Sequence, residues 1–175
     1  MTTSPDFRTI YESEFTYVWQ VLRRLGVRDA DIEDVAHDVF VTVHRRLPDY
    51  DSVRPVRPWL FGISFRIASD YRQSARYRWE VPKDVADTPD GAPTVYDHLV
   101  ARDAQRLVAE ALDTLDTTVR AVFVMHDIEG HSIPEIVDSL DAPLNTLYSR
   151  LRIARRQFSV AVRRLQLRRG QRGEA

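Results

Sequence analysis

Two short apolar patterns in the last third of the chain, separated by a three-residue turn, constrain the fold more than any other feature. Residues 132–156 read SIPEIVDSLDAPLNTLYSRLRIARR. Apolar residues recur at helical spacing on both sides of the turn, at Ile133, Ile136, Val137 and Leu140, then at Leu144, Leu147, Leu151, Ala154 and Phe158. Each side therefore predicts a helix that buries one stripe, with Leu144 facing inward. Pro143 suits the first turn of the second helix, and Asp141 or Ala142 can cap it. Two helices joined in this way are typical of a helix-turn-helix, whose second helix enters the DNA major groove.

The distribution of charge along the chain also points to nucleic acid. Residues 1–85 carry 13 basic and 13 acidic side chains, residues 86–142 carry 3 and 12, and residues 143–175 carry 9 and 1, although the whole chain has a net charge of only −1. A basic end on a nearly neutral chain suggests a nucleic-acid contact there. Arg150, Arg152, Arg155 and Arg156 lie on the expected second helix. Arginines 168, 169 and 172 follow the last clear apolar residue, so they can equally be a solvated tail.

Composition excludes several classes of protein. The chain has no cysteine, which removes disulfides, thiolate catalysis and cysteine zinc sites. No apolar run approaches the length of a membrane span, and the first residues lack a signal peptide pattern, so a cytoplasmic protein without membrane insertion is expected. The dipeptide His37-Asp38 has no supporting cluster of ligands. No catalytic motif is present, and we expect no catalytic residue, metal or cofactor.

Helical patterns fill the rest of the chain outside one segment. Residues 7–25, 31–47 and 58–79 each carry an apolar stripe, and no strand pattern occurs. Residues 80–96 contain three prolines, one glycine and four acidic residues, a composition typical of a linker. The predicted fold is therefore all-α. It has two small helical domains, residues 1–79 and residues 99–175, joined by a flexible acidic linker over residues 80–98.

Two surfaces in the N-terminal half suit binding partners. Asp31, Asp34 and Asp38 recur at spacings of three and four beside an apolar stripe, which fits a partner helix bearing arginines. The same residues also fit an ordinary solvated face. In residues 58–79, arginines including Arg66 alternate with aromatic residues including Trp59, as unstacked single-stranded bases require. The alternative is an aromatic core with a solvated arginine face.

Taken together, three segments resemble the extracytoplasmic-function sigma factors, small bacterial sigma subunits that contain only regions 2 and 4. The segments are DVAHDVFVTVHRRL from Asp34, PWLFGISFRIASDYR from Pro58, and LDTTVRAVFVMHDIEGHSIPEIVDSLDAPLNTLYSRLRIAR from Leu115. The resemblance covers residues 7–79 and 104–165. It implies region 2, with polymerase docking and −10 recognition and melting, in the first domain. It implies region 4, a helix-turn-helix that recognises the −35 element, in the second.

The resemblance also implies roles for individual residues. The polymerase-binding positions are Asp31, Asp34, His37, Asp38 and Phe40. The −10 positions are Tyr50, Asp51, Trp59 and Arg66, with Tyr50 and Asp51 in a loop that receives a flipped base. The −35 positions are Thr146, Tyr148, Ser149, Arg150, Arg152, Arg155 and Arg156. Asn145, Tyr148 and Arg66 depart from the usual family pattern, so the promoter sequence is not implied.

A sigma subunit is not itself an enzyme. The resemblance implies binding to the clamp coiled coil and flap of core RNA polymerase, to promoter DNA and to an anti-sigma factor. The alternative from the residues alone is a stand-alone helix-turn-helix regulator, which has no need of the acidic docking helix or the arginine-aromatic helix.

Overall fold

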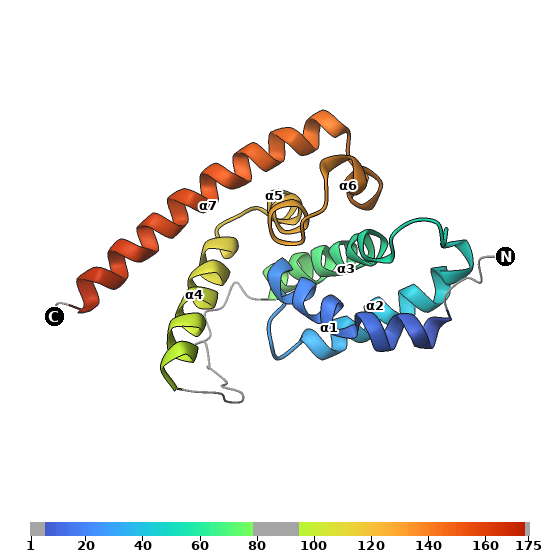
Figure 1. Cartoon of the computed structure of the whole chain (residues 1–175), viewed down its shortest axis with the longest axis horizontal. Helices are drawn as coiled ribbons and strands as arrows, with labels where there is room; N and C mark the ends of the chain where they lie inside the picture. The colour runs from blue at the N-terminus through green and yellow to red at the C-terminus, as the bar shows by residue number, and fades with distance from the viewer. Residues whose placement is uncertain (1–5, 79–94, 174–175) are drawn as a thin grey trace.

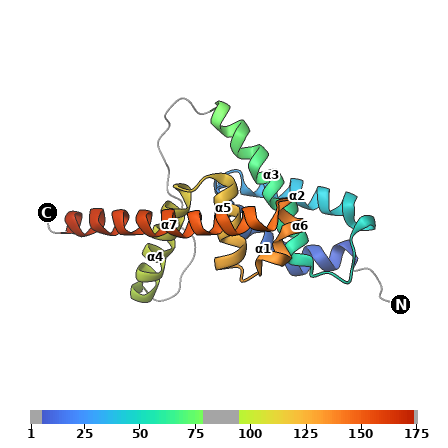
Figure 2. The ribbon, with the colours of Figure 1, turned by 90° about the horizontal axis from the view of Figure 1, so that it is seen from above.

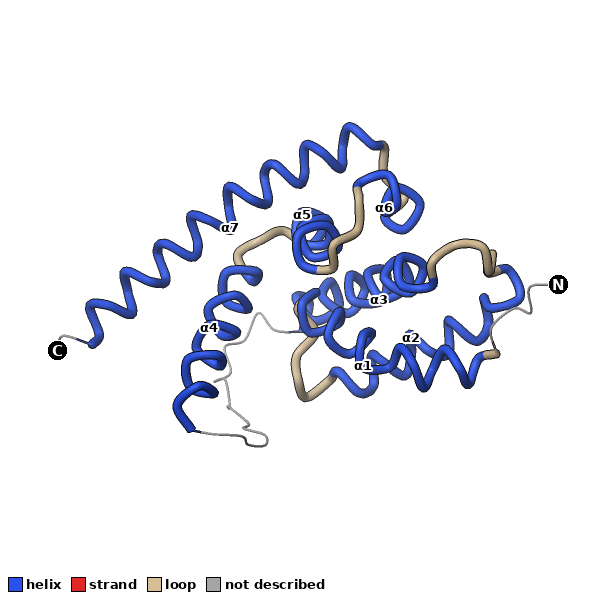
Figure 3. Tube along the Cα trace, viewed as in Figure 1, coloured by secondary structure: helices blue, strands red, loops and turns tan. Residues whose placement is uncertain are grey.

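The computed structural model describes residues 6–78 and 95–173, and every regular element in these two ranges is helical (Figures 1 and 3). The all-α prediction is confirmed. The order is α1 (Phe7–Leu25), α2 (Ile32–Arg46), the short η1 (Leu47–Asp49), α3 (Val56–Arg78), α4 (Val95–Asp113), α5 (Thr117–Phe123), η2 (Val124–Ile128), α6 (Ile133–Leu140) and α7 (Leu144–Gly173).

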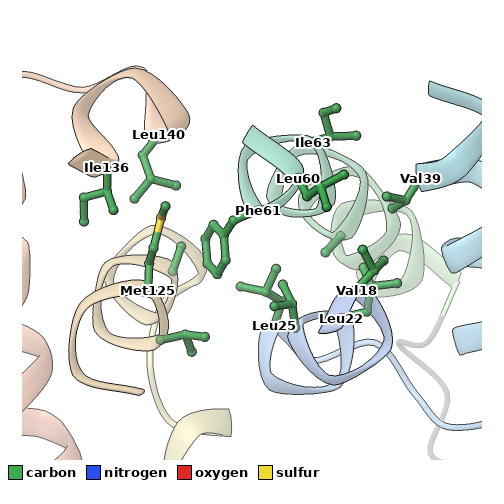
Figure 4. Close-up of a cluster of buried hydrophobic side chains, with 14 of the residues drawn as sticks. Val18, Leu22, Leu25, Val39, Leu60, Phe61, Ile63, Met125, Ile136 and Leu140 are labelled. Carbon is green, nitrogen blue, oxygen red and sulfur yellow. The ribbon is translucent and has the colours of Figure 1, made fainter. Parts of the chain in front are cut away.

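Helices α1, α2 and α3 pack against one another to form the N-terminal unit. Their apolar stripes meet in a core whose members include Val18, Leu22, Val39, Leu60 and Ile63, all at most 2% exposed (Figure 4). Gly26 ends α1 in the left-handed region, at φ +94°, and its N–H reaches the carbonyl oxygens of Leu22 and Arg23. A residue without a Cβ adopts this conformation at little cost, so α1 stops where the sequence predicted.

Helices α4 to α7 form the C-terminal unit, in which α7 packs along α4, α5 and α6. Residues 95–98, predicted as the end of the linker, belong to the first turns of α4, since no proline or glycine follows Pro93 to stop a helix there. The remainder of the predicted linker, residues 80–94, lies outside the described residues. At the other end α7 continues to Gly173, so the basic tail is helical, and Arg169 donates to Glu110 and to the Asp103 carbonyl at 3.0 Å each.

The predicted helix-turn-helix is present as α6 and α7. Ser132 and Glu135 form a capping box at the start of α6, with the Ser132 N–H donating to Glu135 Oε2 at 2.7 Å. The expectation that Asp141 or Ala142 caps the second helix is wrong, because α7 begins at Leu144, directly after Pro143. Asp141 instead ends α6 in the left-handed region, at φ 47°, which aspartate tolerates better than most residues. Pro143 precedes α7, and its carbonyl accepts the N–H of Leu147 at 3.1 Å.

The two units pack directly on each other, because α6 lies against α3 and α5 lies beside α1 (Figure 1). Phe61, fully buried, extends from α3 toward Met125 of η2, so one apolar core runs through both units (Figure 4). At the closest point a Cβ added to Gly62 of α3 would lie 2.7 Å from the Ser139 carbonyl oxygen of α6. Glycine is thus required for α3 and α6 to approach this closely.

Candidate nucleic-acid and protein interfaces

The first turns of α7 present one apolar and one polar face. Leu147 and Leu151 are buried, while Tyr148, Ser149 and Arg152 point outward, as helical spacing predicted. Leu144 does not face inward as expected. It is 42% exposed, because it is the first residue of the helix and only the turn precedes it.

The arginines of this face differ in their partners. Arg152 and Arg156 are exposed, and Arg150 is half-buried, as is Thr146. None of the three arginines forms an ion pair with a residue that the structure describes. Their charges are therefore free to meet phosphate or base edges.

Arg155 has a protein partner that the sequence did not reveal. Its guanidinium donates two hydrogen bonds to the Asp127 carboxylate of η2, from Nε at 2.8 Å and from Nη2 at 2.7 Å. His126 Nδ1 lies 2.8 Å from the same carboxylate. The hydrogen bond from Arg155, and secondarily the one from His126, lowers the pKa of Asp127 from its ordinary value of 3.8. Arg155 is thus held against η2 in this structure.

The predicted −10 positions lie in the loop before α3, at Tyr50 and Asp51, and on α3 itself, at Trp59 and Arg66. The Tyr50 ring rests on the Trp59 indole, with centroids 4.6 Å apart and planes inclined by 33°. The Tyr50 hydroxyl donates to the Arg54 carbonyl at 2.5 Å, and burial raises the pKa of this phenol. Asp51 turns back on its own loop and accepts the Val53 N–H at 3.0 Å. The loop is therefore built around an aromatic pair.

Arg66 lies on the same side of α3 as Trp59, since seven residues make about two helical turns. It is exposed, and its Nη1 reaches the Gly62 carbonyl only at 3.5 Å. Trp59 is half-buried and packs on the core, and part of its surface stays accessible. The structure brings Tyr50, Trp59 and Arg66 into one strip.

The C-terminal unit contacts the loop of this strip. Arg54 Nη1 donates to Asp138 Oδ2 of α6 at 2.6 Å, a link between residues 84 positions apart in the chain. The −10 loop and the helix-turn-helix therefore touch in this structure.

The acidic face of α2 is only partly as predicted. Asp34, His37 and Asp38 are exposed. Asp31 precedes the helix and accepts the Tyr71 hydroxyl at 2.5 Å, and burial together with this hydrogen bond raises the pKa of Tyr71 to about 12. Asp31 is thus engaged within the N-terminal unit.

Phe40 is largely buried. It is 3% exposed and packs edge-on against Tyr11, with centroids 4.7 Å apart, because the apolar stripe of α2 turns it toward α1. Beside it the two helices border an open apolar hollow of 380 Å³, lined by Phe7, Tyr11, His37, Phe40, Val41, His44 and Arg45. The sequence assigned the aromatic residues of α1 to the core, so it missed their place at this surface. The signal that could have found this surface is the series Phe7, Tyr11 and Phe15, aromatic residues spaced by one helical turn.

A buried arginine joins the two units. Arg120 of α5 is 2% exposed; its Nε donates to the Arg24 carbonyl of α1, and its Nη1 pairs with Asp113 at 2.7 Å. Arg24 in turn pairs with Glu129, the residue that follows η2. Burial lowers the pKa of Arg120, opposed by its bond to Asp113. No pattern in the sequence predicts this contact, because Arg120 is not part of a regular series of charges.

Within residues 6–78 and 95–173 no cluster of three potential metal ligands occurs. No helix in the same part of the chain is long and apolar enough to cross a membrane.

Comparison with protein families shows that the sequence matches transcription proteins. The family model described as Sigma-70 region 2 matches residues 10–78, and the model described as Sigma-70, region 4 matches residues 105–158. The ECF RNA polymerase sigma factor SigL of Mycobacterium tuberculosis is 30% identical over 161 residues, which cover 90% of this chain and 89% of SigL. The RNA polymerase sigma factor CnrH of Cupriavidus metallidurans is 31% identical over 151 residues, covering 80% of this chain and 78% of CnrH.

Solved structures show the same arrangement of helices. The structure of CnrH in complex with the cytosolic domain of CnrY matches with a TM-score of 0.63 and 28% identity, over 88% of this chain and 85% of that chain. The sigma factor RpoE in complex with the anti-sigma factor NepR, from Bartonella quintana, matches with a TM-score of 0.70 over 90% of this chain and 97% of that chain. At 18% identity the second match concerns the fold alone.

Proposed function

The chain belongs to the extracytoplasmic-function sigma factors, and from this premise we propose which of its surfaces carry out each step of promoter recognition. A sigma factor of this group directs core RNA polymerase to specific promoters and initiates transcription. It is an initiation factor, and we infer that it has no catalytic activity of its own and works in the cytoplasm. The family favours this function over a stand-alone regulator.

The observation that carries the assignment of the −35 surface is the open face of α7. Arg150, Arg152 and Arg156 have no ionic partner among the described residues, and they follow a capped α6 in helix-turn-helix geometry. We assign base reading to Arg152, with Tyr148 and Ser149 beside it, because arginine on guanine is the commonest specific contact. Arg150 and Arg156 flank this face and are assigned to phosphates. Thr146 and Arg155 complete the surface.

The −10 surface is assigned to Tyr50, Asp51, Trp59 and Arg66. The half-buried Tyr50–Trp59 pair offers an aromatic platform for an unstacked base, and Arg66 supplies a cation on the same side of α3. Replacing Tyr50 with alanine should slow promoter opening more than it weakens closed-complex binding. A permanganate footprint with normal melting in this variant would remove the flipped-base role.

The polymerase-docking surface is assigned to the exposed part of α2. The exposed Asp34 and Asp38 lie on α2 near His37, which lines the apolar hollow between α1 and α2, so acidic side chains lie close to apolar contacts, as a partner helix bearing arginines requires. Asp31 and Phe40 are assigned supporting roles. Asp31 fixes the start of α2 through its hydrogen bond to Tyr71, and Phe40 packs α2 against Tyr11 of α1. The clamp coiled coil of the polymerase is the proposed partner here, and the flap is the proposed partner of the C-terminal unit.

An anti-sigma factor is a further proposed partner. Support comes from the similarity to CnrH, whose solved structure contains the cytosolic domain of CnrY. We also assign residues 1–79 to region 2, residues 80–98 to the linker and residues 99–175 to region 4.

Run-off transcription with bacterial core RNA polymerase on genomic fragments tests the function. The full chain should produce discrete transcripts that core polymerase alone does not. The variant Asp34→Lys/Asp38→Lys should lose core binding in a titration, while the matched double reversal Asp70→Lys/Asp103→Lys, also at exposed positions, should retain it. No transcript from any fragment, together with no binding to core, would contradict the proposal.

A further inference from the structure

Helix α7 carries a second apolar stripe, on the side away from the core. Ile153, Val160 and Leu167 are 37%, 43% and 69% exposed, whereas Leu147, Ala154 and Ala161 on the inner side are at most 7% exposed. The three exposed residues are spaced by seven, so they fall within about 40° of one another around the helix axis and span about 21 Å along it. Figure 2 shows α7 running along the molecule and ending beyond α4. We call Ile153, Val160 and Leu167 the outer stripe.

Arginines border the outer stripe on both sides. Arg156 and Arg163 each follow a stripe residue by three positions, and Arg164 follows Val160 by four, so all three lie one turn from the stripe. They are exposed and have no ionic partner in the described part of the chain. Each pair of turns therefore presents one aliphatic side chain next to unneutralised positive charge.

This combination selects one kind of partner. DNA offers negative charge but few aliphatic contacts, and it does not explain aliphatic residues at every seventh position. An anionic membrane requires a much wider apolar face than a stripe of about 40°. A second copy of α7 would bring arginine against arginine. Spacing by seven is the pattern that one helix presents to another, and the flanking charge requires acidic residues opposite.

We propose that the outer stripe and its bordering arginines bind an acidic amphipathic helix of a partner protein. The partner helix places aliphatic residues on Ile153, Val160 and Leu167 and carboxylates on Arg156, Arg163 and Arg164. Val160, Arg163, Arg164 and Leu167 lie beyond the proposed −35 surface and away from α2 and the −10 strip, whereas Arg156 belongs to both the −35 surface and this one. The partner helix therefore competes with promoter DNA for Arg156, while its other contacts lie further along the C-terminal helix.

The test uses the full chain and a fluorescein-labelled synthetic peptide of three heptads, with leucine and isoleucine on one face and glutamate elsewhere. A second peptide of equal charge carries serine at the apolar positions. In an anisotropy titration, wild type should bind the apolar peptide at least tenfold more tightly than the serine peptide. Val160→Gln/Leu167→Gln should abolish that difference. Glutamine keeps a good helix propensity, and both positions are exposed, so circular dichroism should be unchanged.

Matched controls separate the two parts of the surface. Val53→Gln replaces a valine that is 83% exposed in the loop before α3, and it should bind like wild type. Arg163→Gln/Arg164→Gln should weaken both peptides, while the equally exposed Arg8→Gln on α1 should weaken neither. Equal affinity of wild type for the two peptides, or unchanged affinity in Val160→Gln/Leu167→Gln, would overturn the proposal. Two other results would also overturn it. In each, wild type does not bind the peptide but forms a dimer or binds phosphatidylserine vesicles, and Val160→Gln/Leu167→Gln does neither.

Discussion

The two surfaces proposed to contact DNA differ in how accessible they are in this structure. On the first turns of α7, Tyr148, Ser149 and Arg152 point away from the protein, and among the residues that the structure describes Arg155 is the one arginine of this surface with an ionic partner. At the −10 strip, by contrast, Arg54 of the loop is bound to Asp138 of α6, and Gly62 in the middle of the strip's helix lies against Ser139. The −35 surface is therefore open in this structure, whereas the −10 surface lies beside a packed neighbour.

The difference has a geometric consequence for the proposed function. Elements named −35 and −10 lie about 25 base pairs apart, which is on the order of 85 Å along B-form DNA at about 3.4 Å per base pair. Here the −10 loop and α6 are within hydrogen-bond distance, at 2.6 Å between Arg54 and Asp138. The two units must therefore separate before one molecule can occupy both elements. The predictions below address that contact first and then the individual surfaces.

The largest effect is expected from Gly62→Ala. The new Cβ would lie 2.7 Å from the carbonyl oxygen and 3.2 Å from the Cα of Ser139, and backbone cannot rotate out of the way as a side chain can. Within α3 the change is favourable, because alanine exceeds glycine in helix propensity by about 1 kcal/mol. The units should separate without unfolding, and the radius of gyration from small-angle scattering should rise. Gly170→Ala is the matched control, since nothing lies within 4 Å of its Cβ. An unchanged scattering curve for Gly62→Ala would show that α6 shifts along α3 instead.

Arg120→Met should have the next largest effect. Methionine fills the space of the arginine stem, but it loses the bonds to the Arg24 carbonyl and to Asp113. The expected loss in free energy of unfolding is about 1–3 kcal/mol, measured by urea titration. Arg8→Met removes an exposed arginine and should change the free energy by less than about 0.5 kcal/mol. Equal values for the two variants would mean that Arg120 contributes no more than a surface arginine.

Replacing Arg152 and Arg156 separately distinguishes recognition of bases from binding of phosphates on the −35 surface. Arg152→Ala should relax the preference at one or two base pairs, by about 1–3 kcal/mol each, in a selection over randomised −35 sequences. Arg156→Ala should weaken all sequences alike and reduce the salt slope by about one. Wild-type preference at every position in Arg152→Ala would mean that α7 meets DNA with another face.

The sequence predicted the local structure well and the long-range contacts poorly. The stripe over residues 7–25 gave the bounds of α1, and the Asp-Ala-Pro turn located α6 and α7, because helical periodicity and turn residues act over a few positions. The family resemblance named Phe40 as a polymerase-binding position, but the sequence could not tell that its ring packs against Tyr11 of α1. Only the arrangement of helices decides that.

The contacts between the units had no pattern to reveal them. Gly62 is one glycine in an otherwise ordinary helix, and its importance comes from Ser139, which lies 77 positions later. Arg120 and Asp127 looked like surface charges, since burial and pairing depend on neighbours brought by the fold. The family resemblance supplied the roles of the surfaces, but not the packing that brings the −10 loop against α6.

Asp127→Asn should have the smallest effect on stability and the most specific effect on DNA binding. Exposed ion pairs such as Asp127–Arg155 contribute about 0–1 kcal/mol. Because the pKa of Asp127 is lowered in the folded protein, its contribution is complete above the ordinary value of 3.8 and is lost as the pH falls through the lower folded value. The stability difference between wild type and Asp127→Asn should therefore vanish in strong acid.

At neutral pH the same change releases Arg155 and removes a negative charge beside the −35 surface. The affinity for duplex DNA of any sequence should rise a few-fold, and the salt slope should steepen by up to about one, because one more cation reaches phosphate. Asp103→Asn removes an exposed carboxylate on α4 and should leave both quantities unchanged. If Asp127→Asn instead weakens binding, Asp127 holds Arg155 in the orientation that DNA requires. The only paired arginine of the open surface would then be its best-positioned one, and both DNA surfaces would depend on contacts that the folded protein makes in advance.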